Sequence, residues 1–110
     1  MSMKNVVWSS SAAHDFDDIV SWILNHHSGR HAESFIDMVD EAVQQVANHP
    51  ESGRVVPELE RQNITKYREA VLTPWRLFYS SERERVVIHA VIDGRRNIED
   101  LLLRRNIRFT

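Results

Sequence analysis

The amino-acid sequence predicts an α+β fold, a two-layer sandwich in which an antiparallel pair of helices packs on an antiparallel sheet in the order β-α-α-β-β-β. Two long stretches repeat apolar residues at helical spacing, and only a Ser-Gly pair separates them. Three strand-like runs with short connections follow. Because 110 residues suit one hydrophobic core, we expect a single domain over residues 1–110 that ends in a short helix or tail.

The first predicted element is a short strand at residues 5–8, where Asn-Val-Val-Trp is rich in side chains that favour β structure. The serines that follow can cap a helix by accepting hydrogen bonds from its free N–H groups. Apolar or aromatic side chains then recur on one face of this helix: Phe16, Ile19, Val20, Ile23 and His27. Three acidic residues in its first two turns are expected on the solvent-facing side: Asp15, Asp17 and Asp18.

The second helix is predicted to begin after the Ser28-Gly29 break and to end before Pro50. Its apolar face consists of Ala32, Phe35, Ile36, Val39, Val43, Val46 and Ala47. Since the connection between the helices is short, they are expected to form an antiparallel hairpin with both apolar faces on one shared surface. That surface should be a sheet.

The sheet is predicted from three runs at residues 66–72, 75–80 and 85–93, which follow a polar connection over residues 51–63. Connections of two to four residues between the runs indicate an antiparallel meander. In the second run, alternation places three side chains beneath the helices: Trp75, Leu77 and Tyr79.

Alternation also divides the last run into two faces. One face would hold Val87, His89 and Val91. The other would hold Val86, Ile88, Ala90 and Ile92. Because two helices cover only one side of a sheet, we expect the opposite side and the sheet edges to be open to a partner protein.

The C-terminal segment is predicted to turn at Gly94 and to form a short helix capped by Asn97, with the leucines at 101–103 available for burial. Three basic residues follow in the tail: Arg104, Arg105 and Arg108.

The composition excludes several classes of protein. A hydrophobic fraction of 42% and a charged fraction of 27% are typical of a globular domain and unlike a disordered chain. No apolar run approaches the roughly 18 residues of a membrane span, and the first residues lack a signal peptide's apolar stretch, so we expect a cytoplasmic protein without membrane contact. The absence of cysteine removes disulfides, thiolate catalysis and thiolate metal sites.

The net charge of -2 conceals a division along the chain. Residues 1–53 carry two basic against eight acidic side chains, a net charge of -6, whereas residues 54–110 carry twelve against eight, a net charge of +4. The two halves could attract each other within the fold, or the basic half could supply a functional face.

Four segments carry a resemblance to a known family. They are His-Pro-Glu-Ser-Gly-Arg-Val-Val-Pro-Glu-Leu at 49–59, Tyr-Arg-Glu at 67–69, Pro-Trp-Arg-Leu-Phe-Tyr at 74–79 and Val-Ile-Asp-Gly-Arg-Arg-Asn at 91–97. In this order and at these separations, the sequence from 6 to 97 resembles the RelE/ParE toxins of bacterial type II toxin-antitoxin modules. The resemblance implies a small cytoplasmic toxin that a cognate antitoxin wraps and neutralises.

The family that the sequence resembles has two branches, which differ in their cellular target. RelE-like members cleave messenger RNA on the ribosome, whereas ParE-like members inhibit DNA gyrase without known covalent chemistry of their own. A ribosome-dependent endoribonuclease would here depend on Arg68, Arg76, His89 and Arg96. Ala70 replaces a lysine of the nuclease pattern, and guanidinium groups do not shuttle protons at neutral pH, so His89 is the one candidate for proton transfer.

Both key residues of that site also have a structural interpretation. Arg76 could form an ion pair with Glu69 or Glu58, and His89 could be a packed, hydrogen-bonded strand residue. We therefore prefer the ParE-like hypothesis of a gyrase inhibitor that acts by binding and is not an enzyme. Its expected target-binding residues are Arg95, Arg96, Arg104, Arg105 and Arg108.

The nuclease stays the alternative, and a degenerate member that only binds its antitoxin is a third possibility. The expected partners are the antitoxin and DNA gyrase, or the ribosome and messenger RNA in the alternative. No cofactor or metal is expected, because no two helical histidines share a helix at the i, i+4 spacing of a metal site.

Overall fold

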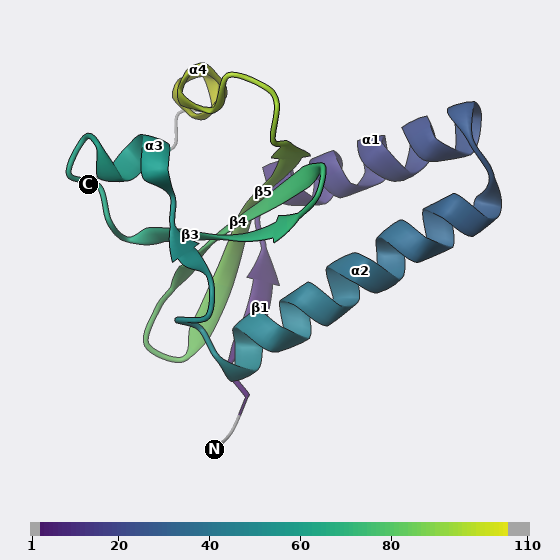
Figure 1. Cartoon of the computed structure of the whole chain (residues 1–110). Coiled ribbons are helices and arrows are strands. Elements are labelled where there is room, and N and C mark those ends of the chain that lie inside the picture. The colour runs from purple at the N-terminus through teal and green to yellow at the C-terminus, as the bar shows by residue number, and fades with distance from the viewer. Residues whose placement is uncertain (1–2, 106–110) are drawn as a thin grey trace.

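A computed structural model describes residues 3–105, with the side chains of Leu102 and Leu103 left aside. The elements are β1 (Asn5–Trp8), α1 (Ser10–His26), α2 (Gly29–Asn48), β2 (Arg54–Val55), α3 (Pro57–Glu60), β3 (Tyr67–Leu72), β4 (Trp75–Ser81), β5 (Arg85–Asp93) and α4 (Ile98–Arg104). The α+β class, the helix hairpin and the meander are confirmed (Figure 1). Within the described residues, none of the helices is long and apolar enough to cross a bilayer.

Two short elements, β2 and α3, were not predicted, because they lie in the stretch expected to be a polar connection. Pro57 stands in the first turn of α3, where its missing N–H costs nothing. The helix buries a single side chain, that of Leu59. So short a helix leaves too few apolar residues to show a helical period in the sequence.

The sheet has the strand order β1-β5-β4-β3-β2. The pairs β3–β4 and β4–β5 are antiparallel, as expected, but β1 pairs with β5 in parallel, so the prediction of a wholly antiparallel sheet was wrong at this edge. Short turns force neighbouring strands to run in opposite directions, whereas only the helix hairpin links β1 to the rest of the sheet. That hairpin returns the chain to the start of β1, where the Lys4 N–H donates to the Ala47 carbonyl at 3.1 Å.

The main core lies between the helix hairpin and one face of the sheet. Phe35 and Val39 of α2 pack there with Leu77 and Tyr79 of β4, and Trp75 packs at the margin, as predicted. A second core occupies the opposite face, under α3 and α4, and consists of Val56, Leu59, Tyr67, Phe78, Ala90, Ile92, Ile98 and Leu101. The expectation that this face would be open was therefore wrong over the area that α3 and α4 cover.

A β-bulge at His89 reverses the side-chain alternation along β5. Phe78 pairs with Ala90 and the next residue, Tyr79, pairs with Ile88, so His89 is the extra residue. Beyond it, Val91 joins Ile88 in the helix-side core, whereas Ala90 lies in the second core. The predicted faces of β5 were correct before the bulge and wrong after it, because one inserted residue exchanges the two faces.

Each long helix begins with a side-chain cap. The Ser9 hydroxyl accepts from the Ala12 N–H at 3.1 Å, and the Ser28 hydroxyl accepts from the His31 N–H at 3.3 Å. At α4 the Asn97 side chain accepts from the Asp100 N–H at 3.0 Å, as predicted. These caps fix where the helices begin on the sheet.

Candidate functional site

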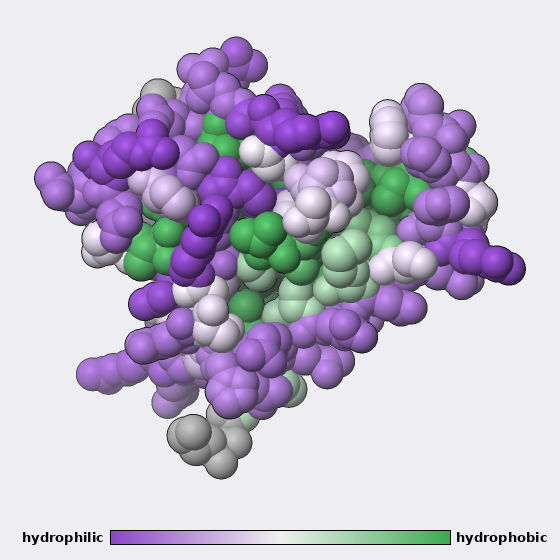
Figure 2. Space-filling view, in the orientation of Figure 1, coloured by the Kyte–Doolittle hydropathy of each residue, from purple (hydrophilic) through white to green (hydrophobic). Residues whose placement is uncertain are grey.

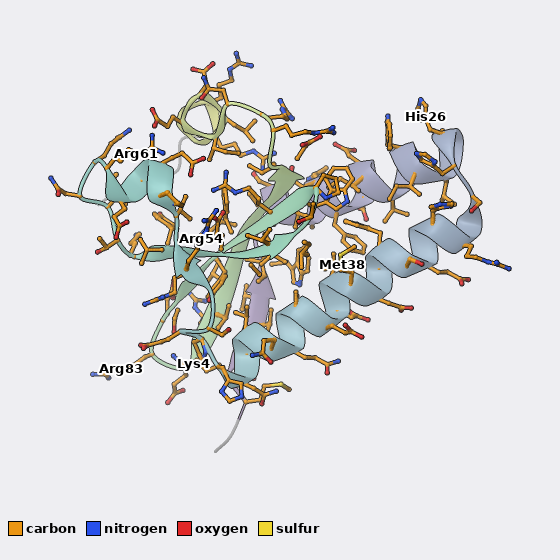
Figure 3. The ribbon with its side chains drawn as sticks, viewed as in Figure 1. Lys4, His26, Met38, Arg54, Arg61 and Arg83 are labelled. Atoms are coloured by element: carbon orange, nitrogen blue, oxygen red, sulfur yellow. The ribbon has the colours of Figure 1, made fainter. Side chains whose placement is uncertain are left out.

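A buried ion-pair network joins β4 to β3 and α3. The Arg76 guanidinium donates from Nε to Glu69 Oε2 at 2.5 Å and from its two terminal nitrogens to Glu58 at 2.8 and 2.9 Å. The Arg54 Nε donates to the other Glu69 oxygen at 2.6 Å, and the Glu69 side chain is fully buried. The expected structural pairing of Arg76 with Glu58 and Glu69 is confirmed (Figure 3, where Arg54 is labelled).

The network pairs the positive charge of Arg76 with two carboxylates of the same domain. Hydrogen bonding to Glu58 raises the pKa of the Arg76 guanidinium, and the same bond lowers the pKa of the Glu58 carboxyl. The Arg76 side chain is only 10% exposed, and its guanidinium stacks 5.1 Å from the centre of the Phe78 ring. Each of its three nitrogens donates to a glutamate, so two carboxylates already balance the positive charge of the guanidinium.

Arg68 lies on the other face of the sheet from Arg76. It pairs in register with Tyr79, which belongs to the helix-side core, and its Nη1 donates to the Gly53 carbonyl at 2.7 Å. Two of the four arginine and histidine positions of a nuclease are therefore separated by the sheet itself.

His89 sits at the bulge and is partly buried. Its Nε2 hydrogen-bonds with the Ser80 hydroxyl at 2.7 Å, and its ring meets the Tyr67 ring edge-on at 5.1 Å. Burial lowers the pKa of the His89 imidazole. Among the described residues, the side-chain contacts that the structure gives for His89 are with Ser80 and Tyr67, which fits the packed-strand interpretation.

This environment predicts a pH dependence of stability. Since the pKa of folded His89 lies below the unfolded value of about 6.5, the unfolded chain binds more protons as the pH falls through that region. His89 therefore makes the free energy of unfolding decrease from pH 7.5 toward the folded pKa. Between pH 7.5 and pH 5.5 we expect the free energy of unfolding to fall less in His89→Gln than in wild type. Urea titrations at the two pH values measure the change. The exposed His14→Gln is the control, and an unchanged pH slope in His89→Gln would contradict the buried, neutral assignment.

The arginines expected to bind a target fall into different environments. The Arg95 side chain is 79% exposed at the end of β5 and bonds Asp93 at 2.9 and 2.6 Å, which lowers the pKa of the Asp93 carboxyl to about 2. Arg96 is also exposed, and Arg104 is exposed beside Asp100 at 3.5 Å. We call Arg95, Arg96 and Arg104 the exposed arginines. Arg108 lies outside the described residues.

Arg105 does not belong with the exposed arginines. Its guanidinium forms a bidentate ion pair with Asp15 of α1, and its side chain is 20% exposed. Asp15 Oδ2 also accepts a hydrogen bond at 3.0 Å from the N–H of Val91, just after the bulge. The expectation of a solvent-facing Asp15 was thus wrong, because this carboxylate accepts from a backbone N–H of β5 that lies beyond the end of β1, whose last pair is Trp8 with Ile88.

The sequence held a signal for Asp15 that the prediction did not use. Asp15 follows Ala12 by three residues and precedes Ile19 by four, so it lies on the buried side of α1. Asp17 and Asp18 are exposed, as expected.

Two hollows lie beside α2. The larger hollow, about 720 Å³, lies between the two long helices and the β3–β4 turn, and its lining includes Ile19, Trp22, Phe35, Met38 and Trp75, together with Asp93 and Arg95. The smaller hollow, about 400 Å³, lies between α2 and the outer edge of β3. Figure 2 shows the apolar surface of this region between polar margins, and Figure 3 labels Met38 on α2. Among the described residues, no three His, Cys, Asp or Glu side chains are placed to hold a metal ion.

A helix hairpin on one face of a five-stranded sheet and two short helices on the other define a small α+β domain. The model of the ParE toxin family of type II toxin-antitoxin systems, parDE, matches residues 6–98, so the chain belongs to this family. It is therefore a toxin of a type II toxin-antitoxin module, and the predicted membership of the ParE-like branch is confirmed.

One solved structure with a similar fold is a chain of the chromosomal ParDE toxin-antitoxin system from P. aeruginosa. The two chains share 17% sequence identity at a TM-score of 0.66, over 83% of this chain and 96% of the other. At this identity the likeness shows the fold alone. A search of curated proteins found no match to this sequence.

Proposed function

We propose that this chain acts in the cytoplasm as a toxin that inhibits DNA gyrase by binding it, and that a cognate antitoxin neutralises it. The observation that carries the proposal is the dispersal of the nuclease candidates. Arg68 and Arg76 are bonded to Gly53 and to the two glutamates on opposite faces of the sheet, and His89 packs against Tyr67. RNA cleavage requires proton-transfer groups and cations that converge on one phosphate. A binding toxin requires only an accessible surface.

The exposed arginines and the adjoining hollow supply such a surface. Arg95 belongs to the lining of the larger hollow together with Trp22, which is 48% exposed. A cationic side chain beside aromatic and aliphatic ones suits recognition of a protein surface, because Trp and Arg are enriched among the residues that dominate binding energy. Of the five arginines expected to bind the target, we therefore propose Arg95, Arg96 and Arg104 as the binding residues.

The test compares Arg95→Ala/Arg96→Ala with His89→Gln after induction in bacteria. We expect the arginine variant to lose growth inhibition, because it removes exposed contacts and leaves the core untouched, and His89→Gln to keep it. Growth curves measure the effect, and each variant is first shown to melt like wild type and to bind the antitoxin.

A nuclease predicts the opposite pattern. Loss of a proton-transfer group typically costs 10² to 10⁴ in rate, so His89→Gln would then abolish growth inhibition. Toxicity that disappears with His89 and survives the arginine changes would overturn the proposal. Absence of toxicity in wild type would indicate the degenerate member. Truncation before α4 is a poor test, since Ile98 and Leu101 are buried in the second core.

A further inference from the structure

A carboxylate of the first long helix meets the C-terminal end of α4 at the edge of the sheet. Asp15 is buried, and its Oδ2 accepts from the Val91 N–H at 3.0 Å, beyond the point where β1 stops pairing with β5. Both Asp15 oxygens also accept from the guanidinium of Arg105, the residue that directly follows α4. One side chain therefore joins three separate segments, which are α1, the end of β5 and the end of α4.

This ion pair connects the helix layers on the two faces of the sheet. α1 contributes Ala12 and Ile23 to the helix-side core, whereas α4 contributes Ile98 and Leu101 to the second core on the opposite face. In Figure 1 the helix hairpin and α4 accordingly lie on different sides of the strands. Past Ile88, β5 has no further partner in β1, so side chains from the two layers can meet at this edge.

The pairing matters because a buried carboxylate is costly without a cation. An ionised carboxylate loses its hydration on burial, and a bidentate guanidinium supplies both the opposite charge and hydrogen bonds. Among the residues that the structure describes, Arg105 is the cation that forms a salt bridge with Asp15. Of these contacts, the carboxylate would keep the Val91 N–H if the end of α4 moved away. The burial of Asp15 therefore favours the state in which α4 is docked.

The end of α4 has few other anchors. The helix has seven residues, too few to be stable without packing. Among its described side chains, the buried ones are Ile98 and Leu101, which lie in its first four residues. The contact between Arg104 and Asp100, at 3.5 Å, joins two exposed side chains, and such pairs contribute little. Within the described part of the chain, the pair with Arg105 is thus the ion pair that anchors the end of this helix.

The same helix separates the residues proposed to bind gyrase. Arg95 and Arg96 precede α4, and Arg104 is its last residue, directly before Arg105. The position of Arg104 relative to the other two therefore depends on how the end of α4 is held. A side chain that is already in place loses less conformational entropy on binding than one that must first be ordered.

We propose that Asp15 is a positioning residue for target binding: through Arg105 it holds the end of α4, so that Arg104 keeps its place relative to Arg95 and Arg96. The inference rests on the proposed function, since it takes gyrase as the target. Asp15 itself is buried and does not touch the target. Its effect on binding passes through the ion pair alone.

Asp15→Asn tests the docking of α4, because it removes the charge and keeps the shape. Its amide oxygen can still accept from the Val91 N–H, whereas the ion pair with Arg105 is lost. The Arg105 amide donates to the Leu101 carbonyl at 3.1 Å in the last turn of α4. We expect it to exchange its hydrogen about tenfold faster in Asp15→Asn than in wild type, while the Val91 amide stays protected. Asp17→Asn removes a charge from an exposed position on the same helix and should change neither amide.

Inhibition of purified gyrase in a supercoiling assay measures the consequence for binding. We expect Asp15→Asn to require about fivefold more protein than wild type for half-inhibition, which corresponds to a loss of about 1 kcal/mol. Combined with Arg104→Ala, Asp15→Asn should cause no further loss, since both changes remove the same contact. Asp17→Asn should inhibit as wild type does. Should Asp15→Asn not fold, Arg105→Gln breaks the same ion pair from its other partner and takes its place.

The outcomes separate this inference from the proposed function. Unchanged exchange of the Arg105 amide in Asp15→Asn would overturn the docking role. Full inhibition by Asp15→Asn, or a loss that adds to that of Arg104→Ala, would overturn the positioning of Arg104 and leave the proposed function standing. Failure of the wild-type chain to inhibit supercoiling would overturn both, because Arg104 would then have no such target to meet.

Discussion

Glu69→Ala is expected to lower the free energy of unfolding by about 3–5 kcal/mol, because it removes one of the two carboxylates that pair with the buried Arg76 guanidinium. The Glu69 carboxylate is fully buried and accepts from Arg76 at 2.5 Å and Arg54 at 2.6 Å. Without it, Arg76 keeps only the Glu58 contacts, and the pair that joins β2 to β3 is lost. Urea denaturation followed by circular dichroism measures the change.

A surface ion pair provides the control for this prediction. Glu82 bonds Arg85 at 2.8 Å, but their side chains are 45% and 53% exposed, so Glu82→Ala should cost no more than about 1 kcal/mol. A loss below 1 kcal/mol for Glu69→Ala would show that the network does not hold α3 and β2 to the sheet.

Leu77→Ala is expected to cost about 2–5 kcal/mol, and Phe35→Ala a similar amount, because each change opens a cavity in the helix-side core. Leu77 is 0% exposed and Phe35 is 2% exposed. Either loss is a large share of the 5–15 kcal/mol that typically stabilises a domain, so the variants can be partly unfolded at 37 °C.

Leu24→Ala is the matched control for these core substitutions, since Leu24 is 53% exposed on α1. It should fall within about 0.5 kcal/mol of wild type. Denaturation curves in which Leu77→Ala and Leu24→Ala coincide would refute the placement of β4 beneath the helices.

Elements governed by local periodicity could be predicted from the sequence. Both long helices and the strands β3, β4 and β5 are found within a residue or two of their expected bounds, because each carries several apolar side chains at a fixed spacing. The parallel pairing of β1 with β5 was missed, since no short turn links the two strands and periodicity carries no information on their direction.

The candidate site depended on contacts that no local pattern encodes. The pairing of Arg76 with Glu58 and Glu69 was anticipated as an alternative, but the bulge at His89 was not, and it changed the face of Val91. The bidentate pair of Asp15 and Arg105 joins residues that are 90 positions apart. Such a pair becomes visible only when the fold brings α1 and the C-terminal end together.

The central claim is that toxicity comes from binding to gyrase, and a supercoiling assay with purified proteins tests it most directly. Purified wild-type chain is titrated into gyrase and relaxed plasmid, with the antitoxin-bound chain and Arg95→Ala/Arg96→Ala in parallel. The same protein samples are added to a cell-free translation reaction, in which primer extension follows a translated message. We expect that the free wild-type chain inhibits supercoiling, that the antitoxin-bound chain and the arginine variant do not, and that the message stays intact. Full supercoiling activity together with codon-spaced cuts in the message would contradict it.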